Sequence, residues 1–153
     1  MTPACLPPEE AITRLVRCFE HLQPDTVAEL GRLYAPDARF KDPFNEVQGV
    51  PAIEAIFQHM FGALEQPRFV VTGRVVQGAQ CFLTWDFCFA MRNVHQGVEQ
   101  KVRSATHLVL DDQGLVTLHR DYWDAAEELY EKLPVLGGLM RWLRRSASAT
   151  STT

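Results

Sequence analysis

The chain has 153 residues, of which 46% are hydrophobic and 22% are charged, a composition typical of one ordinary folded domain and not of a disordered or fibrous chain. Its formal charge of -4 has the wrong sign for attraction to nucleic-acid phosphates, so we expect no nucleic-acid partner. No apolar run approaches the roughly 20 residues that span a bilayer, and the start lacks the pattern of a signal peptide. We therefore expect a cytoplasmic protein without membrane contact.

The cysteines and histidines do not follow metal-binding spacing. The four cysteines are Cys5, Cys18, Cys81 and Cys88. They form no CxxC pair, and the five histidines form no HExxH or HxxxH pair. A domain of this size needs no disulfide or metal to fold. We therefore predict free thiols, no metal site and no cofactor.

Two helices are predicted before residue 37. From Glu9, apolar residues recur with the 3,4-spacing of an amphipathic helix, which ends before Pro24. Asp25 can cap a second, shorter helix that ends at Pro36. A short strand over residues 38–41 is then expected, because the residue before Pro43 is disfavoured in a helix.

The next segment, as far as Gly49, is predicted to be a loop. Pro51 suits the first turn of a helix. The strongest helical stripe of the sequence follows it and runs to Leu64. A third helix is therefore expected.

Strands follow Pro67, where the sequence becomes rich in Val, Phe, Thr and Trp. Four are predicted, over residues 68–77, 79–93, 98–110 and 115–124, with turns at Gly78, Gly97 and residues 112–114. Short turns between long strands favour a bent antiparallel meander, since parallel neighbours need crossovers of a dozen or more residues. The fold class is therefore α+β.

The end of the chain carries a helical pattern. It covers residues 125–133, is interrupted by Pro134, and continues over residues 136–145. The second part carries three arginines beside Trp142 and could be an interfacial amphipathic helix. The alternative is a helix that docks on its own domain or on a dimer mate. We predict one domain over residues 9–145, with flexible tails at 1–8 and 146–153.

The last predicted hairpin indicates which side chains share a face of the sheet. Its register pairs Leu110 with Thr117, Leu108 with His119, Thr106 with Asp121, and Ser104 with Trp123. Because side chains alternate along a strand, His119, Asp121 and Trp123 then point one way. Arg120 and Tyr122 point the other way, and a slip of one residue would reverse the assignment.

The first of these faces could carry proton-transfer chemistry. A carboxylate and an imidazole on adjacent same-side positions can act as general base and acid. The structural alternative is that His119 and Asp121 only bond each other or solvate the rim of the sheet. Asp42 is a second candidate, although an Asp-Pro pair is first of all a turn former.

The run Leu-Tyr-Ala-Pro-Asp-Ala-Arg-Phe-Lys-Asp-Pro, from Leu33 to Pro43, precedes Gly49, a helix and a terminal meander. This order resembles the nuclear-transport-factor-two-like superfamily and, within it, the SnoaL-like proteins, over about residues 9–124. The resemblance implies a cone-shaped, strongly curved, mostly antiparallel sheet wrapped around N-terminal helices, with a pocket at its open end. The helix after residue 124 is then an addition to that fold.

The resemblance also implies roles for the two aspartates. In the ketosteroid isomerases of this superfamily, the Asp before Pro is the proton-shuttling base, which implies that role for Asp42. By spacing, Cys18 and Thr106 stand near the positions where those isomerases carry their two oxyanion donors. The missing donors argue against a steroid isomerase of that type. In the SnoaL-like polyketide cyclases an Asp on the last strand is the acid/base, which implies Asp121, and the hairpin register adds His119 as its helper.

The predicted function is cofactor-independent proton transfer on a small apolar carbonyl compound, by an isomerase, cyclase or dehydratase. The predicted catalytic residues are Asp42, His119 and Asp121. The predicted substrate-binding residues are Tyr34, Phe57, Phe61, Trp85, Phe87, Thr106 and Trp123. The alternative is a non-catalytic ligand-binding or dimeric interaction module, and the apolar groups on the opposite face of the last hairpin predict a homodimer through the sheet.

Overall fold

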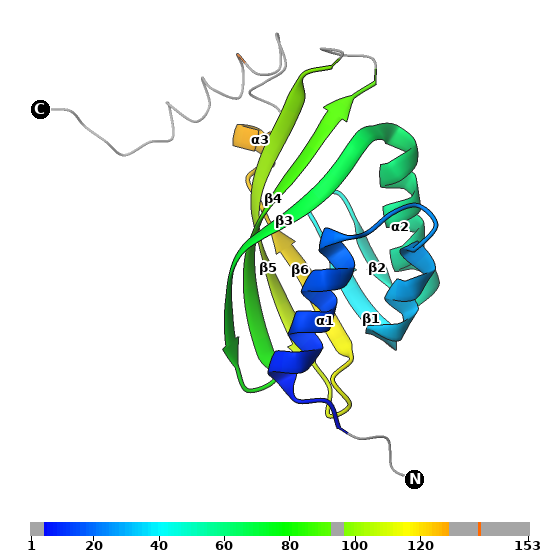
Figure 1. Cartoon of the computed structure of the whole chain (residues 1–153), viewed down its shortest axis with the longest axis vertical. Helices are drawn as coiled ribbons and strands as arrows, with labels where there is room; N and C mark the ends of the chain where they lie inside the picture. Colours follow the sequence, from blue (N-terminus) through cyan, green and yellow to red (C-terminus); the bar gives the residue numbers. More distant parts are fainter. Residues whose placement is uncertain (1–4, 93–96, 129–137, 139–153) are drawn as a thin grey trace, which may run out of the picture. The chain divides into compact units, whose positions relative to one another are not determined.

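A computed structural model describes residues 5–92, 97–128 and 138. They belong to two compact units that divide between Tyr122 and Trp123. In the first unit, drawn from blue to yellow in Figure 1, the elements are α1 (Pro8–Glu20), η1 (Val27–Arg32), β1 (Tyr34–Lys41), β2 (Glu46–Gln48), α2 (Val50–Ala63), β3 (Leu64–Gln77), β4 (Gln80–Met91), β5 (Glu99–Leu110) and β6 (Val116–Tyr122). The second unit contains α3 (Ala125–Glu128).

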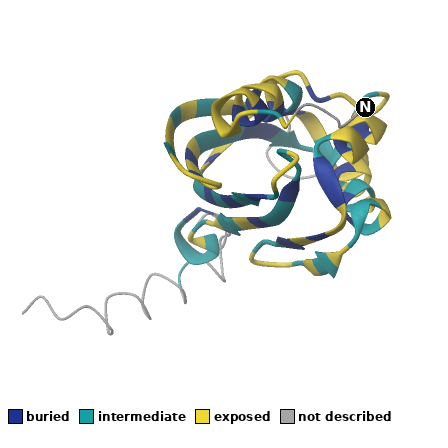
Figure 2. Ribbon diagram, turned by 90° about the horizontal axis from the view of Figure 1, so that it is seen from below, coloured by how far each residue is buried: buried dark blue, intermediate teal, exposed yellow. Residues whose placement is uncertain are grey.

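The first unit is built on one six-stranded sheet with the order β2-β1-β6-β5-β4-β3. The strands from β3 to β6 form the predicted antiparallel meander. β1 joins β6 in parallel, and β2 is antiparallel to β1. Figure 2 shows how strongly these strands curve. The predicted fold class, α+β with a mostly antiparallel sheet and N-terminal helices, is confirmed.

The core lies between the sheet and the helices. The apolar stripe of α1 is buried, with Ile12 and Leu15 at 0% and 2% exposure. Ile53 of α2 and Leu108 of β5 are both fully buried as well. Burying one such side chain stabilises the fold by roughly 1.5–3 kcal/mol. These contacts hold α1 and α2 on the same face of the sheet and therefore position the residues described below.

The second predicted helix is wrong in its type and length. Residues 27–32 form a 3-10 helix whose N-cap is Thr26 and not Asp25. Tyr34 and Pro36 belong to β1, so this strand begins four residues before the expected position. The pairing of β1 with β6 is irregular between Tyr34 and Arg39. Pro36, which lacks an N–H, lies in this irregular stretch and therefore disturbs no regular ladder.

Two further boundaries differ from the expected ones. The segment predicted as a loop before Gly49 contains the short strand β2, which is paired with β1. β3 begins at Leu64, directly after α2, and includes Pro67. The register of β3 against β4 shifts between Glu65 and Arg68, and this bulge accommodates the proline. Gly49 has a φ of 95°, a conformation that favours glycine, and so allows the tight entry into α2.

Other expectations lie outside the described residues. They concern residues 129–133 of the predicted terminal helix, the basic segment 136–145 apart from Gly138, and most of the predicted tails. Of the helices in the described ranges, none is both long and apolar enough to cross a membrane.

Candidate active site

The hairpin of β5 and β6 places His119 and Asp121 on the face of the sheet that α1 and α2 cover. Leu108 pairs with His119 and Thr106 with Asp121, as the sequence predicted. The expected pair of Leu110 and Thr117 is wrong, because Leu110 pairs with Val116 across a β-bulge. The bulge absorbs one residue near the turn and leaves the register beyond it unchanged.

A small cavity of about 30 Å³ lies between this face and the helices. It is lined by Leu15, Val16, Phe19, Phe57, Phe69, Val71, Leu83, Trp85, Thr106, Leu108, His119 and Asp121. A space of this size has room for only one or two water-sized molecules, and a larger guest would need side chains to move. Among the described residues that line the cavity there is no lysine or arginine.

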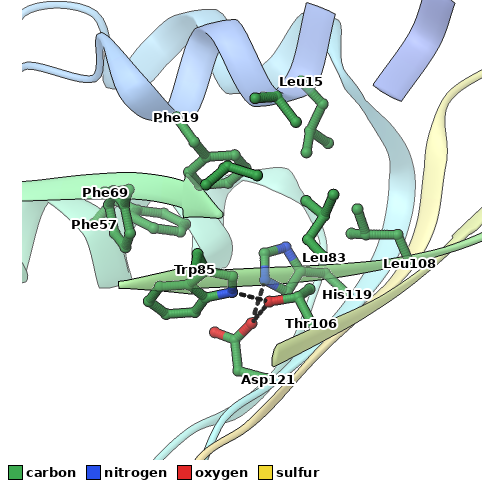
Figure 3. Close-up of a pocket in the computed structure, with 12 residues that line it drawn as sticks. Leu15, Phe19, Phe57, Phe69, Leu83, Trp85, Thr106, Leu108, His119 and Asp121 are labelled. Atoms are coloured by element: carbon green, nitrogen blue, oxygen red, sulfur yellow. Dashed lines mark hydrogen bonds and ion pairs between the residues drawn. The ribbon is translucent and has the colours of Figure 1, made fainter. Parts of the chain in front are cut away.

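Aromatic rings form one wall of the cavity (Figure 3). Phe19 of α1 lies 5.5 Å from Phe57 of α2, between ring centroids, and 5.7 Å from Phe69 of β3. Phe69 in turn meets the Trp85 ring edge-to-face at 5.3 Å. Tilted and edge-to-face pairs at these distances stabilise aromatic clusters. The wall is therefore apolar and well packed.

A chain of hydrogen bonds runs from Trp85 to Asp121 along the opposite side of the cavity. The Trp85 Nε1–H donates to Thr106 Oγ1 at 2.6 Å, and the Thr106 hydroxyl donates to Asp121 Oδ1 at 2.5 Å. These residues lie on β4, β5 and β6, and Figure 3 shows the bonds as dashed lines. Burying a carboxylate costs free energy unless hydrogen-bond donors surround it. The Thr106 hydroxyl is one such donor to Asp121.

The imidazole of His119 lies against the same carboxylate oxygen. Its Nε2 lies 2.8 Å from Asp121 Oδ1, and its Nδ1 lies 2.6 Å from the Tyr34 hydroxyl oxygen. Only 6% of the His119 side chain and 10% of the Asp121 side chain are exposed. Burial, and next to it the Asp121 charge, raises the pKa of Tyr34 well above its ordinary value. Tyr34 therefore keeps its proton at neutral pH.

Asp42, the other predicted base, lies in the turn between β1 and β2. Its Oδ1 accepts hydrogen bonds from the backbone N–H groups of Phe44 and Asn45, at 2.7 and 2.6 Å. The Asn45 side-chain amide donates to both of its carboxylate oxygens. Asp42 is not among the residues that line the cavity. The structure thus brings His119 and Asp121 together and leaves Asp42 apart from them.

The predicted substrate-binding residues fall into three groups. Phe57, Trp85 and Thr106 line the cavity, and Tyr34 bonds His119 behind it. Phe61 and Phe87 are not lining residues, and the Phe87 ring stacks on Phe69 at 4.8 Å. Trp123 is also absent from the lining and begins the second unit.

Several lining residues were not singled out by the sequence, chiefly Phe19 and Phe69. Phe19 belongs to the predicted stripe of the first helix and Phe69 to a predicted strand, so both read as ordinary core residues. Nothing in a one-dimensional pattern separates a side chain that lines a cavity from one that fills the core.

Metal-ligating groups do not gather in the parts of the chain that the structure describes, where no three His, Cys, Asp or Glu side chains could hold a metal ion together. The four cysteines are free thiols, as predicted. Burial raises the pKa of Cys81 to about 11, so this thiol stays protonated at neutral pH.

The fold and the covered face of the sheet define an NTF2-like, ketosteroid isomerase-like protein. The family model of the SnoaL-like domain matches residues 15–119. The chain belongs to the SnoaL-like family. No curated protein matches the sequence significantly.

Solved structures support the same fold. A hypothetical protein with a ketosteroid isomerase-like fold from Catenulispora acidiphila, crystallised with trimethylamine, is 18% identical with a TM-score of 0.66, covering 78% of this chain and 89% of that one. A protein from Jannaschia sp. assigned as a SnoaL-like polyketide cyclase is 19% identical, with a TM-score of 0.66 and coverages of 78% and 87%. An LEH-like epoxide hydrolase of M. tuberculosis is 15% identical, with a TM-score of 0.64 and coverages of 90% and 96%.

These likenesses define the fold and leave the activity open. The matched structures include an epoxide hydrolase, a polyketide cyclase and a steroid isomerase. Several others are NTF2-like proteins of unknown function. One fold that serves many chemistries gives no reaction by itself. The function has to be argued from the residues of the cavity.

Proposed function

We propose that the chain binds a small, mainly apolar molecule in the cavity beneath α1 and that Asp121 accepts a proton from it, with His119 as its partner. The observation that carries this proposal is the position of Asp121. Its side chain is nine-tenths buried, lines a cavity whose other lining residues are mainly apolar, and uses only Oδ1 for hydrogen bonds to the described residues. A carboxylate oxygen left over in such a place is suited to take a proton.

The reaction class that fits is a cofactor-independent isomerase, cyclase or dehydratase step on a small carbonyl compound. The proton would leave a carbon next to the carbonyl group and pass to Asp121. His119, held by Tyr34, orients the carboxylate. The cavity is small, so the aromatic wall would have to open for a substrate larger than a few atoms.

Deuterium exchange tests this proposal without a known substrate. The protein is incubated in D₂O with a panel of small enolisable ketones and β-diketones, and loss of their α-proton signals is followed by NMR. We expect exchange above the buffer rate for at least one compound, a fall of about 100-fold or more in Asp121→Asn, and retention in Asp42→Asn. Equal exchange in wild type and Asp121→Asn, or none above the buffer rate, would contradict the proposal.

A second candidate is non-catalytic binding of a small ammonium cation. The cavity combines a buried carboxylate with aromatic rings of Phe19, Phe57, Phe69 and Trp85, and both kinds of group attract alkylated ammonium ions. The Catenulispora relative was crystallised with trimethylamine. Trimethylammonium and the neutral, similarly shaped tert-butanol form a matched pair of probes. Tight binding of the cation alone would favour this candidate, and equal binding would exclude it.

The outer face of the sheet favours a homodimer, and we propose that two copies pack through it. Val75 and Phe82 are neighbours on β3 and β4, with exposures of 67% and 49%, and Tyr122 of β6 is 49% exposed. Phe82 stacks on His107 on the same face. Exposed apolar groups in one place are typical of an interface. Sedimentation should give a dimer that Phe82→Glu dissociates, and a monomeric wild type would overturn the assignment.

A further inference from the structure

A second hollow, of about 490 Å³, lies on the outside of α1, where this helix meets η1. It shares no lining residue with the cavity on the other side of α1. Its arginines are Arg14 and Arg17 of α1 and Arg32 of η1. Among the described lining residues, Glu29 is the only acidic one. Three arginines against one glutamate leave the hollow positive, although the chain as a whole has a formal charge of -4.

The three guanidinium groups have no ion pair or hydrogen bond within the part of the chain that the structure describes. Acidic residues stand at spacings that often give ion pairs on a helix. Glu10 precedes Arg14 by four residues, and Glu29 precedes Arg32 by three. Neither pair forms an ion pair. The N–H donors of the arginines are therefore available to an anion from outside.

Stabilisation of the helix end accounts for only one of these arginines. Arg17 lies in the last turn of α1, where a cation complements the partial negative charge of the helix C-terminus. Arg14 lies three residues earlier, at a spacing where like charges repel each other. Arg32 brings a third positive charge from another element. An anion between the three groups would remove this repulsion.

The remaining polar groups of the hollow do not supply that anion. His21 Nδ1 lies 2.9 Å from the carbonyl oxygen of Arg17, and because a carbonyl can only accept, Nδ1–H donates to it. Burial, and next to it the charge of Glu29, raises the pKa of the Cys18 thiol. The thiol therefore stays protonated at neutral pH and adds no negative charge. Glu29 alone opposes the binding of an anion.

A hollow on the outer face of the sheet also carries cations, Arg39, Lys41 and Arg120. Two of them have partners. Lys41 Nζ lies 3.2 Å from Glu46, and the Arg120 guanidinium carbon lies 4.9 Å from the centre of the Tyr122 ring. The same face is the one that we propose for the homodimer. The hollow beside α1 is therefore the better candidate for an anion site.

We propose that the hollow between α1 and η1 binds the phosphate group of a soluble small molecule through Arg14, Arg17 and Arg32. The planar guanidinium group donates two parallel N–H bonds to phosphate oxygens. A phosphate monoester carries about -1.5 to -2 charges at neutral pH, which suits the excess of arginines over Glu29. Apart from His21, no aromatic side chain is among the described lining residues, so the phosphate group itself is what the site recognises. This site goes beyond the proposed function, because it does not involve Asp121.

Calorimetric titration with inorganic pyrophosphate at low ionic strength tests the site. We expect saturable binding that added salt weakens, because exposed charges are screened. Arg17→Gln should lower the affinity about tenfold, as loss of hydrogen bonds between charged groups allows. Arg39→Gln removes the same charge from the outer face of the sheet and should change the affinity by less than about twofold. No saturable binding, or an equal loss in both variants, would overturn the proposal.

Glu29→Gln should have the opposite effect, because it removes the one negative charge of the hollow. We expect pyrophosphate to bind about threefold more tightly to this variant. Glu65→Gln, which removes the same charge from an exposed position on β3, should leave the affinity unchanged. An equal gain in both variants, or no gain in Glu29→Gln, would contradict the proposal.

NMR shifts of the histidine rings locate the bound anion. We expect pyrophosphate to shift the signals of His21 and to leave those of His59, an exposed residue of α2, in place. A shift of His107 alone would place the anion on the outer face of the sheet and overturn the proposal. Vesicles of phosphatidylcholine with phosphatidic acid distinguish a soluble phosphate from a lipid headgroup. Sedimentation with these vesicles that Arg17→Gln abolishes would overturn the assignment to a soluble ligand.

Discussion

Asp42 and Asp121 are both strand-end aspartates that could serve as a base, yet the structure treats them oppositely. Both carboxylate oxygens of Asp42 accept hydrogen bonds from the backbone and a side chain of its own turn. Asp121 is held by side chains from other strands and from His119, and it keeps one oxygen without a bond to the described residues. The difference shows that a carboxylate can act on a ligand only through an oxygen that the fold has not already hydrogen-bonded. Sequence motifs do not carry that information.

The largest effect expected from this comparison is on stability. Asp121→Ala leaves the donors of Thr106 and His119 buried without an acceptor, which should lower the free energy of unfolding by about 3 kcal/mol. Asp42→Ala removes only the acceptor of the hydrogen bonds in a partly exposed turn. It should lower the free energy of unfolding by about 1 kcal/mol. Urea denaturation of the two variants measures both values. Equal losses would show that Asp121 is no more deeply embedded than Asp42.

A smaller effect is expected when one donor to Asp121 is removed. Thr106→Val keeps the shape of the side chain but deletes both the donor to Asp121 and the acceptor for Trp85. We expect a loss of about 1–2 kcal/mol in the free energy of unfolding. Thr84→Val, which alters an exposed hydroxyl bond on the outer face of β4, is the control and should change stability by less than about 0.5 kcal/mol. A larger loss in the control than in Thr106→Val would contradict the network.

The smallest expected effect on stability concerns Tyr34 and appears only at alkaline pH. Its folded pKa lies well above the ordinary value of 10.0, so its contribution to stability is fully present below about pH 10 and is lost as the pH rises toward the folded pKa. Between about pH 10 and the folded pKa, the free energy of unfolding should fall by up to about 1.4 kcal/mol per pH unit because of this group. Tyr34→Phe should show a flatter alkaline profile than wild type, and Tyr122→Phe should not. Identical profiles for both variants would show that Tyr34 is not buried beside Asp121.

Much of the fold could be predicted because periodicity and turn residues are local signals. The stripe of α1 and the meander from β3 to β6 follow directly from apolar spacing and from glycine turns. The strand that contains Pro36 could not be predicted in this way, since a proline ordinarily ends a regular element and β6, its irregular partner, lies far along the sequence. The parallel pairing of β1 with β6 has the same cause.

The candidate site was predicted in part. The alternation of the last hairpin placed His119 and Asp121 on one face, and the bulge that moved Leu110 did not disturb them. The link from Trp85 through Thr106 depends on two strand registers at once, and the link to Tyr34 depends on the crossing of β1. These contacts join residues up to 85 positions apart, so no local pattern contains them.

Asp121, and not Asp42, is expected to offer a carboxylate oxygen to a guest in the cavity. Carboxyl-carbon NMR on selectively labelled aspartates tests it most directly during a titration with pyrrole. We predict that the Asp121 signal shifts in proportion to occupancy while the Asp42 signal stays in place. A shift of Asp42 alone, or a bound pyrrole that leaves Asp121 unmoved, would contradict the account.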